Sequence, residues 1–193
     1  GVEQNKDVGT WVKLDKSVVT LPAKTKTTVG FTLTVPENAD VGSHAGGIVV
    51  WAAKAPDAAG QQKGQLQVVT RVAARLFLTV PGDMIRKLDI SNVGHYIDQG
   101  VLYFKMTLRN DGNMTLLPEA DIKLRGIFGR DGQQDRSQLG MLLRDTTINA
   151  KSPWQKRPPK IGRFVTDIRL HYGEKDFKNE FVKDEYQDVK YVF

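Results

Sequence analysis

The sequence contains no cysteine, which excludes disulfide bonds, thiol catalysis and zinc sites built on cysteine. No apolar run approaches the ~20 residues that a membrane-spanning helix needs, so no span is expected within this chain. No signal peptide opens the chain. No stretch keeps a period of 3.6, so long amphipathic helices are not expected either. These absences favour a chain of strands and turns.

The charge balance is basic but evenly spread. The 193 residues include 28 Lys and Arg against 22 Asp and Glu, which gives a net charge of +6. Residues 1–86 and residues 87–193 each carry +3 of this total. A positive protein attracts anionic partners such as nucleic acid, teichoic acid or a membrane surface. Because the charge is diffuse, a solvated surface of mixed charge is the favoured interpretation.

The stretch Val29–Val50 organises the first half of the chain. Its odd-numbered residues from Val29 to Val35 are apolar, and this period of two is typical of a half-buried strand. Pro36 ends that strand, and a polar turn follows at 37–40. The glycine-rich segment Gly42–Gly47 then leads into a second apolar strand at 48–51. The pattern predicts a strand–turn–strand unit of a β-sandwich.

Further strands are expected along the whole chain, separated by turns every 8–12 residues, as in a sandwich. In the strand at 102–109 the residues Leu102, Phe104, Met106 and Leu108 are predicted to face inward, with Tyr103, Lys105 and Arg109 outward. Asn110–Asn113 is a strong turn signal. The expected strands are 11–15, 18–22, 29–35, 48–51, 66–80, 88–93, 102–109, 122–129, 140–143, 147–148, 163–172 and 189–193.

The sequence motifs of several segments resemble those of the WxL-interacting protein family of bacterial surface proteins. The resemblance rests on Trp11, 31–36, 42–48, 75–82 and 110–118, and on their order along one chain. It implies a peptidoglycan-binding domain at residues 1–84 and a second immunoglobulin-like domain at 85–193. The expected fold is therefore all-β, with two tandem immunoglobulin-like β-sandwich domains.

The first domain departs from this pattern because only ten residues precede Trp11. An immunoglobulin-like sandwich needs about seven strands, and only about five are expected before Pro81. Either the chain was cut or processed, which is the favoured explanation, or the missing strands come from a partner by β-strand addition.

The sequence contains no recognisable set of catalytic residues, so an enzyme is not expected. The histidines His44, His95 and His171 do not pair at metal-binding spacing, so no metal and no cofactor are expected. There is no nucleophile elbow and no phosphate-binding loop. The acidic cluster at 131–135 lacks the spacing of a calcium loop, which favours a solvated hairpin.

Two places are candidates for binding. His44 is either a binding-loop side chain or a turn residue that bonds to local backbone, and the second is favoured. A basic run without any acid is either a patch for anionic polymers or a solvated, proline-rich loop with its tryptophan packed on the sandwich edge, and the loop is again favoured. This run comprises Lys151, Trp154, Lys156, Arg157, Lys160 and Arg163.

The expected function is a non-catalytic binding or adhesion protein at the bacterial cell surface, extracellular and anchored in its full-length form. Its expected partners are a cell-wall polymer or other surface proteins, as the resemblance implies. One alternative is a subunit or chaperone-like component of a surface filament, completed by a strand from a partner. Another is an accessory module that binds carbohydrate. No nucleic-acid motif supports a nucleic-acid partner.

Overall fold

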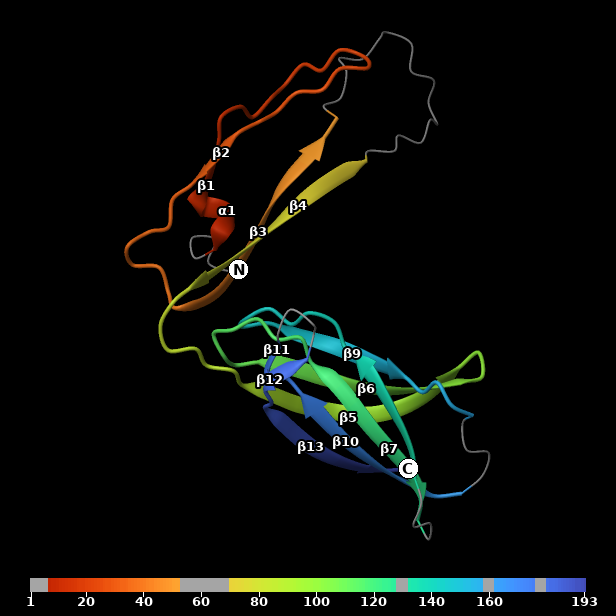
Figure 1. Cartoon of the computed structure of the whole chain (residues 1–193). Helices are drawn as coiled ribbons and strands as arrows, with labels where there is room; N and C mark the ends of the chain where they lie inside the picture. Colours follow the sequence, from red (N-terminus) through yellow and green to blue (C-terminus); the bar gives the residue numbers. More distant parts are fainter. Residues whose placement is uncertain (1–6, 53–69, 128–131, 158–161, 176–179) are drawn as a thin grey trace. The chain divides into compact units, whose positions relative to one another are not determined.

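A computed structural model of the chain describes residues 7–52, 70–127, 132–157, 162–175 and 180–193 (Figure 1). The candidate residue Lys160 lies outside these ranges. The chain divides into two compact units. Unit 1 takes the described parts of Gly1–Asp40 and His44–Val80, and unit 2 takes Val41–Ser43 with Pro81–Phe193. Strands dominate both units, so the prediction of an all-β fold is confirmed.

One layer of unit 2 is a four-stranded antiparallel sheet in the order β13-β10-β7-β8. The central pair is in register over its full length, from Phe164 opposite Gly126 to His171 opposite Glu119. The strands are β7 (Glu119–Gly126), β8 (Gln133–Gln138), β10 (Phe164–His171) and β13 (Tyr186–Val192).

The other layer is a three-stranded antiparallel sheet in the order β5-β6-β9. Its strands are β5 (Leu88–Asp98), β6 (Val101–Asn110) and β9 (Thr147–Pro153). The pairing of β5 with β6 shifts between Ser91 and Gly94, which marks a β-bulge. Asn92, inside this bulge, has a φ of 51°, in the left-handed region.

The two sheets of unit 2 enclose one apolar core (Figure 1). The predicted inward residues Leu102, Phe104, Met106 and Leu108 are each no more than 2% exposed, which confirms the alternation of this strand. The facing sheet contributes Ala120, Ile122 and Leu124 from β7, and Ile168 and Leu170 from β10. Unit 2 is therefore a closed β-sandwich.

Asn110 secures the corner at the end of β6. Its side chain is fully buried and its amide nitrogen donates to the carbonyls of Met114, Leu142 and Leu143, at 2.7, 3.3 and 3.2 Å. Its Oδ1 accepts the backbone N–H of Gly112 at 3.0 Å. A Cβ at Gly112 would lie 2.3 Å from the carbonyl oxygen of Ile85, so this corner requires glycine.

Unit 1 contains one helical turn and two separate two-stranded sheets. Helix α1 (Val8–Trp11) leads directly into β1 (Val12–Leu14), which pairs antiparallel with β2 (Phe31–Leu33). The longer strands β3 (Gly42–Trp51) and β4 (Arg71–Val80) pair with each other. Among the described residues of unit 1, burial is confined to Val8, Trp11 and His44.

Most large apolar side chains of unit 1 are exposed. Val12, Leu14, Phe31 and Leu33 share one face of the β1–β2 pair, because opposite and alternate residues of paired strands lie on the same side. Phe31 is nevertheless 46% exposed. On β3 and β4 the exposed apolar side chains are Val49, Val50, Trp51, Val72 and Phe77.

Several expected elements are wrong in detail. Gly42–Gly47, expected to be a turn, is the first half of β3, and the expected strand at 18–22 does not form. Two short paired strands, β11 (Glu174–Lys175) and β12 (Phe181–Lys183), are absent from the expected set. Strand β8 was not predicted because its sequence, QQDRSQ, has no apolar residue to reveal a period.

Candidate binding surfaces

Within the described ranges, no group of three or more His, Asp or Glu side chains could hold a metal ion. The histidines lie on separate strands with separate partners. His95 Nδ1 is 3.1 Å from the Tyr191 hydroxyl. His171 Nδ1 is 2.9 Å from a carboxylate oxygen of Asp184. His95 thus contacts the last strand, β13, whereas His171 contacts the segment between β12 and β13.

His44 is built into the interior of unit 1. It is 1% exposed, and its Nε2 donates a hydrogen bond to the carbonyl of Asp40 at 2.8 Å. Its Nδ1 lies 3.4 Å from a carboxylate oxygen of Asp7, and its ring centroid lies 4.6 Å from that of Trp11. Both ring nitrogens therefore face protein groups, and the side chain joins the start of β3 to α1.

The predicted basic run is distributed over different parts of unit 2. Lys151 is exposed on β9, and Lys156 and Arg157 are exposed in the segment after that strand. Arg163 is exposed directly before β10, where its carbonyl accepts the N–H of Ile127 at 3.1 Å. Lys151 therefore belongs to the three-stranded sheet, whereas Arg163 adjoins the four-stranded one.

Trp154 lies in the core and presents no face to solvent. It is 2% exposed and meets Phe104 edge to face, with ring centroids 6.1 Å apart. Its backbone N–H donates to the carbonyl of Leu102 at 2.8 Å, which extends the pairing of β9 with β6 by one residue. The favoured interpretation was a ring packed on the sandwich edge, and the structure places the ring under the sheet, in the core.

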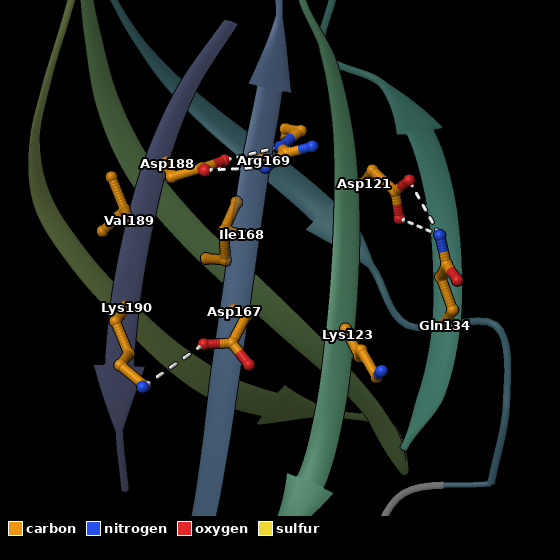
Figure 2. A pocket seen from close by; sticks show the side chains of 9 residues that line it. All are labelled: Asp121, Lys123, Gln134, Asp167, Ile168, Arg169, Asp188, Val189 and Lys190. Atoms are coloured by element: carbon orange, nitrogen blue, oxygen red, sulfur yellow. Dashed lines mark hydrogen bonds and ion pairs between the residues drawn. The ribbon is translucent and has the colours of Figure 1, made fainter. Parts of the chain in front are cut away.

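The outer surface of the four-stranded sheet is hollowed and lined with charges (Figure 2). Across β7, β10 and β13, Asp121, Arg169 and Asp188 lie side by side in register. The next row is Lys123, Asp167 and Lys190. Each row alternates in sign, and so do neighbouring rows. We call these six residues with Gln134 the charge-paired face.

Most groups of the charge-paired face are paired with one another. Arg169 donates two hydrogen bonds to the Asp188 carboxylate, at 2.7 and 2.8 Å. This pairing raises the pKa of Arg169 and lowers the pKa of Asp188. The amide of Gln134 donates to both oxygens of Asp121, and Lys190 lies 3.9 Å from Asp167 (Figure 2). A ligand would have to displace these contacts.

A second hollow lies on the outer surface of the three-stranded sheet. The strand register aligns the residues of this surface in three rows across the sheet. The rows are Tyr96–Tyr103, Gly94–Lys105–Lys151 and Thr107–Asn149. The buried Met106 and Ala150 belong to its floor. We call this surface the tyrosine–lysine face. Its residues are Asn92, Tyr96, Tyr103, Lys105, Thr107, Asn149 and Lys151.

The tyrosine–lysine face combines aromatic rings with cations. Tyr96 and Tyr103 are stacked, with ring centroids 5.1 Å apart and planes 10° apart. The ammonium group of Lys151 lies 5.8 Å from the centroid of Tyr96. Lys105 and Lys151 stand directly opposite each other, and neither forms an ion pair within the described part of the chain.

A polar relay borders the lysines on the same face. The Thr107 hydroxyl donates to Asn149 Oδ1 at 3.0 Å and accepts from the Asn92 amide nitrogen at 3.4 Å. An asparagine side chain has both donor and acceptor groups, so this relay leaves the Asn149 amide N–H groups and the Asn92 Oδ1 for other partners. The face thus offers rings, two cations, a donor and an acceptor.

Only part of this surface was visible in the sequence. Lys151 was singled out, and Tyr103 and Lys105 were placed on the outward side of their strand. Tyr96, Asn92 and Asn149 were missed, because no short motif joins residues from three strands. The available signal was the outward alternation of each strand, without the register that aligns them.

Comparison of the chain with protein-family models, with curated proteins and with solved structures finds no match. The single helix among the described residues, α1, is far from the length of a membrane span.

Proposed function

We propose that the protein is a non-catalytic binding protein of the bacterial cell surface that contacts a cell-wall polymer. On this proposal its two units are tandem immunoglobulin-like domains of an extracellular, anchored protein. The resemblance of its motifs to WxL-interacting proteins supports the compartment. The described residues contribute no metal-binding cluster, and each of their histidines contacts other protein groups.

The observation that carries the proposal is the pair of lysines on the tyrosine–lysine face. Exposed cations on a folded surface commonly pair with acids, as Arg169 does with Asp188. Like charges directly opposite on adjacent strands are unfavourable. Lys105 and Lys151 form such a pair, beside two aromatic rings and an amide relay. An anionic, hydroxyl-bearing ligand would relieve the repulsion and occupy the hollow.

The test is sedimentation of the purified chain with isolated bacterial cell walls at low salt and at ~0.5 M salt, where exposed charges are strongly screened. We expect the chain to sediment with the walls at low salt and to stay in solution at high salt. Failure to sediment under either condition would contradict the proposal. Serum albumin, tested under the same conditions, controls for trapping.

A second candidate function is supported by the exposed apolar strands of unit 1. In this second candidate function, the protein is a component of an assembly, and a strand from a partner completes its first domain. Among the described residues, no further strand pairs with β1–β2 or with β3–β4, and β3 makes one backbone hydrogen bond outside its pair, from Ser43 to Asn113. Val50 and Val72 are 65% and 67% exposed. In β-strand addition, the added strand pairs with an unpaired strand edge of this kind, next to an exposed apolar face.

Hydrogen exchange of the isolated chain tests this second candidate. Backbone amides on the unpaired edges of β3 and β4 should exchange rapidly, and those of β6 and β7, inside their sheets, slowly. A partner that adds a strand should slow exchange in β3 or β4 alone. Equal protection of β4 and β7 in the isolated chain would mean that unit 1 is already complete, and this candidate would be abandoned.

A further inference from the structure

The two lysines of the tyrosine–lysine face direct their side chains toward the same strand. Lys105 leans over β5 at Gly94, where a Cβ would lie 3.0 Å from the Lys105 Cε. Lys151 crosses from β9 and brings its ammonium group to 5.8 Å from the Tyr96 ring. Gly94 and Tyr96 are two residues apart on β5, so they share one face of the sheet. Both cationic groups therefore gather over the same part of β5.

Two neighbouring ammonium groups that have no carboxylate partner favour a ligand with concentrated negative charge. The described structure gives neither lysine an acid partner, whereas the nearby Arg109 pairs with Asp111 at 2.6 Å. Lysine acts as a point charge toward phosphate, and two of them can contact different oxygens of one phosphate group. A phosphodiester fits this arrangement, since it has two free oxygens on one centre.

The rest of the face is matched by a sugar or polyol. Tyr96 lines one end of the hollow, and the Tyr103 ring is stacked against it. The Asn149 amide N–H groups and the Asn92 Oδ1 lie along the other side, beside Thr107. Hydroxyl groups both donate and accept, so a polyol can satisfy this donor and this acceptor together. The phosphate position lies between the rings and the amides.

We propose that the tyrosine–lysine face binds a phosphodiester-linked polyol or sugar polymer. Lys105 and Lys151 contact the phosphate, Tyr96 and Tyr103 contact the carbon framework, and the asparagines contact hydroxyl groups. This inference rests on the proposed function, because it names the polymer chemistry and the residues that such wall binding would use.

The experiment measures affinity of the full chain for soluble poly(glycerol phosphate), by titration at low salt. The test variant is K105Q/K151Q. The matched control is K123Q/K190Q, which removes two lysines from the charge-paired face of the same sandwich. We expect the test variant to lose at least ~10-fold in affinity and the control to change by less than ~2-fold. Thermal unfolding of both variants establishes that they remain folded.

Titrations with two other anionic polymers test which chemical class of ligand binds. Poly-glutamate carries negative charge without polyol, and single-stranded DNA carries phosphate with bases. We expect both to bind the wild-type chain more weakly than poly(glycerol phosphate) does. Tyr96→Ala should weaken binding of poly(glycerol phosphate) while leaving binding of poly-glutamate unchanged, because only the former contacts the ring.

Specific outcomes would overturn this inference. Equal losses in K105Q/K151Q and K123Q/K190Q would mean diffuse electrostatic attraction. Tighter binding of DNA would replace the ligand class by nucleic acid. If K105Q/K151Q still sediments with cell walls as the wild type does, the inference fails and the proposed function stands. If the wild-type chain does not sediment with walls at all, the proposed function fails first.

Discussion

Units 1 and 2 are built from similar alternating strands, yet they differ sharply in what those strands bury. In unit 2 the inward side of β6 is closed by a facing sheet, and Phe104 is fully buried. In unit 1 the apolar residues of β3 and β4 lack comparable cover, and Phe77 is 54% exposed. Alternation creates an apolar face, but a second layer is needed to remove that face from water.

The largest expected effect compares one phenylalanine from each unit. Phe104→Ala should lower the free energy of unfolding of unit 2 by ~3–5 kcal/mol, because it leaves a cavity in a packed core. Phe77→Ala should cost less than ~1 kcal/mol, because its side chain already contacts water. Denaturant titrations of the two variants and the wild type measure both values.

Equal losses in these two variants would contradict the comparison of the units. They would mean that Phe77 is buried in solution, for instance by association of two chains. Sedimentation velocity of the wild type at several concentrations would identify such association, and the exposed strands of unit 1 would then be an interface between copies.

A smaller effect is expected at the corner of unit 2. Asn110→Ala should destabilise unit 2 by ~1.5–3 kcal/mol, because the carbonyls of Met114, Leu142 and Leu143 each lose one hydrogen bond from the buried Asn110 amide. Asn149→Ala is the matched control, since Asn149 is exposed and accepts a single hydrogen bond, and it should cost less than ~1 kcal/mol. Similar values for both variants would show that the corner is not a determinant of the closed sandwich.

The smallest effect is expected from the surface charges of the charge-paired face. Arg169 lowers the pKa of Asp188, so the stabilisation from this pair is present above the ordinary aspartate pKa and is lost as pH falls through the lowered value. Both side chains are exposed, so the loss should be small and weakened by salt. NMR titration should return the Asp188 pKa to its ordinary range in Arg169→Gln. An unchanged pKa would exclude the pairing.

Much of unit 2 could be predicted from the sequence, because local patterns suffice where strands are strongly apolar on one side. The inward series from Leu102 to Leu108 and the turn at Asn110 are clear examples. Strand β8 could not be predicted in this way. It lacks apolar residues and forms because its backbone pairs with β7, from Glu119 opposite Gln138 to Leu124 opposite Gln133.

In unit 1 the turn expected at Gly42–Gly47 is a strand for a physical reason. Glycine-rich segments are typical of turns, but here the missing side chains permit close packing of a strand. A Cβ at Gly46 would lie 2.9 Å from the backbone nitrogen of Gly9, at the start of α1. Such a requirement for close approach depends on an element distant in sequence, and no local pattern could reveal it.

The candidate binding residues also include some that the sequence alone could indicate and others that depend on the tertiary structure. Lys151 was selected for its charge, and its exposure on β9 is compatible with that role. Trp154 was a candidate because it lies among basic residues, and the favoured alternative was a ring packed on the sandwich edge. The ring packs against Phe104 in the core. Tyr96 was not selected, because its neighbours Tyr103 and Lys151 come from two other strands.

The sequence by itself determined the all-β class, the inward side of the strongest strands and the corner at Asn110, because each depends on nearest neighbours along the chain. Only the tertiary structure decided which apolar faces are covered, which glycines allow close packing, and which cations remain without acids. Those properties depend on strand register and on the presence of a second layer, which bring together residues far apart in sequence.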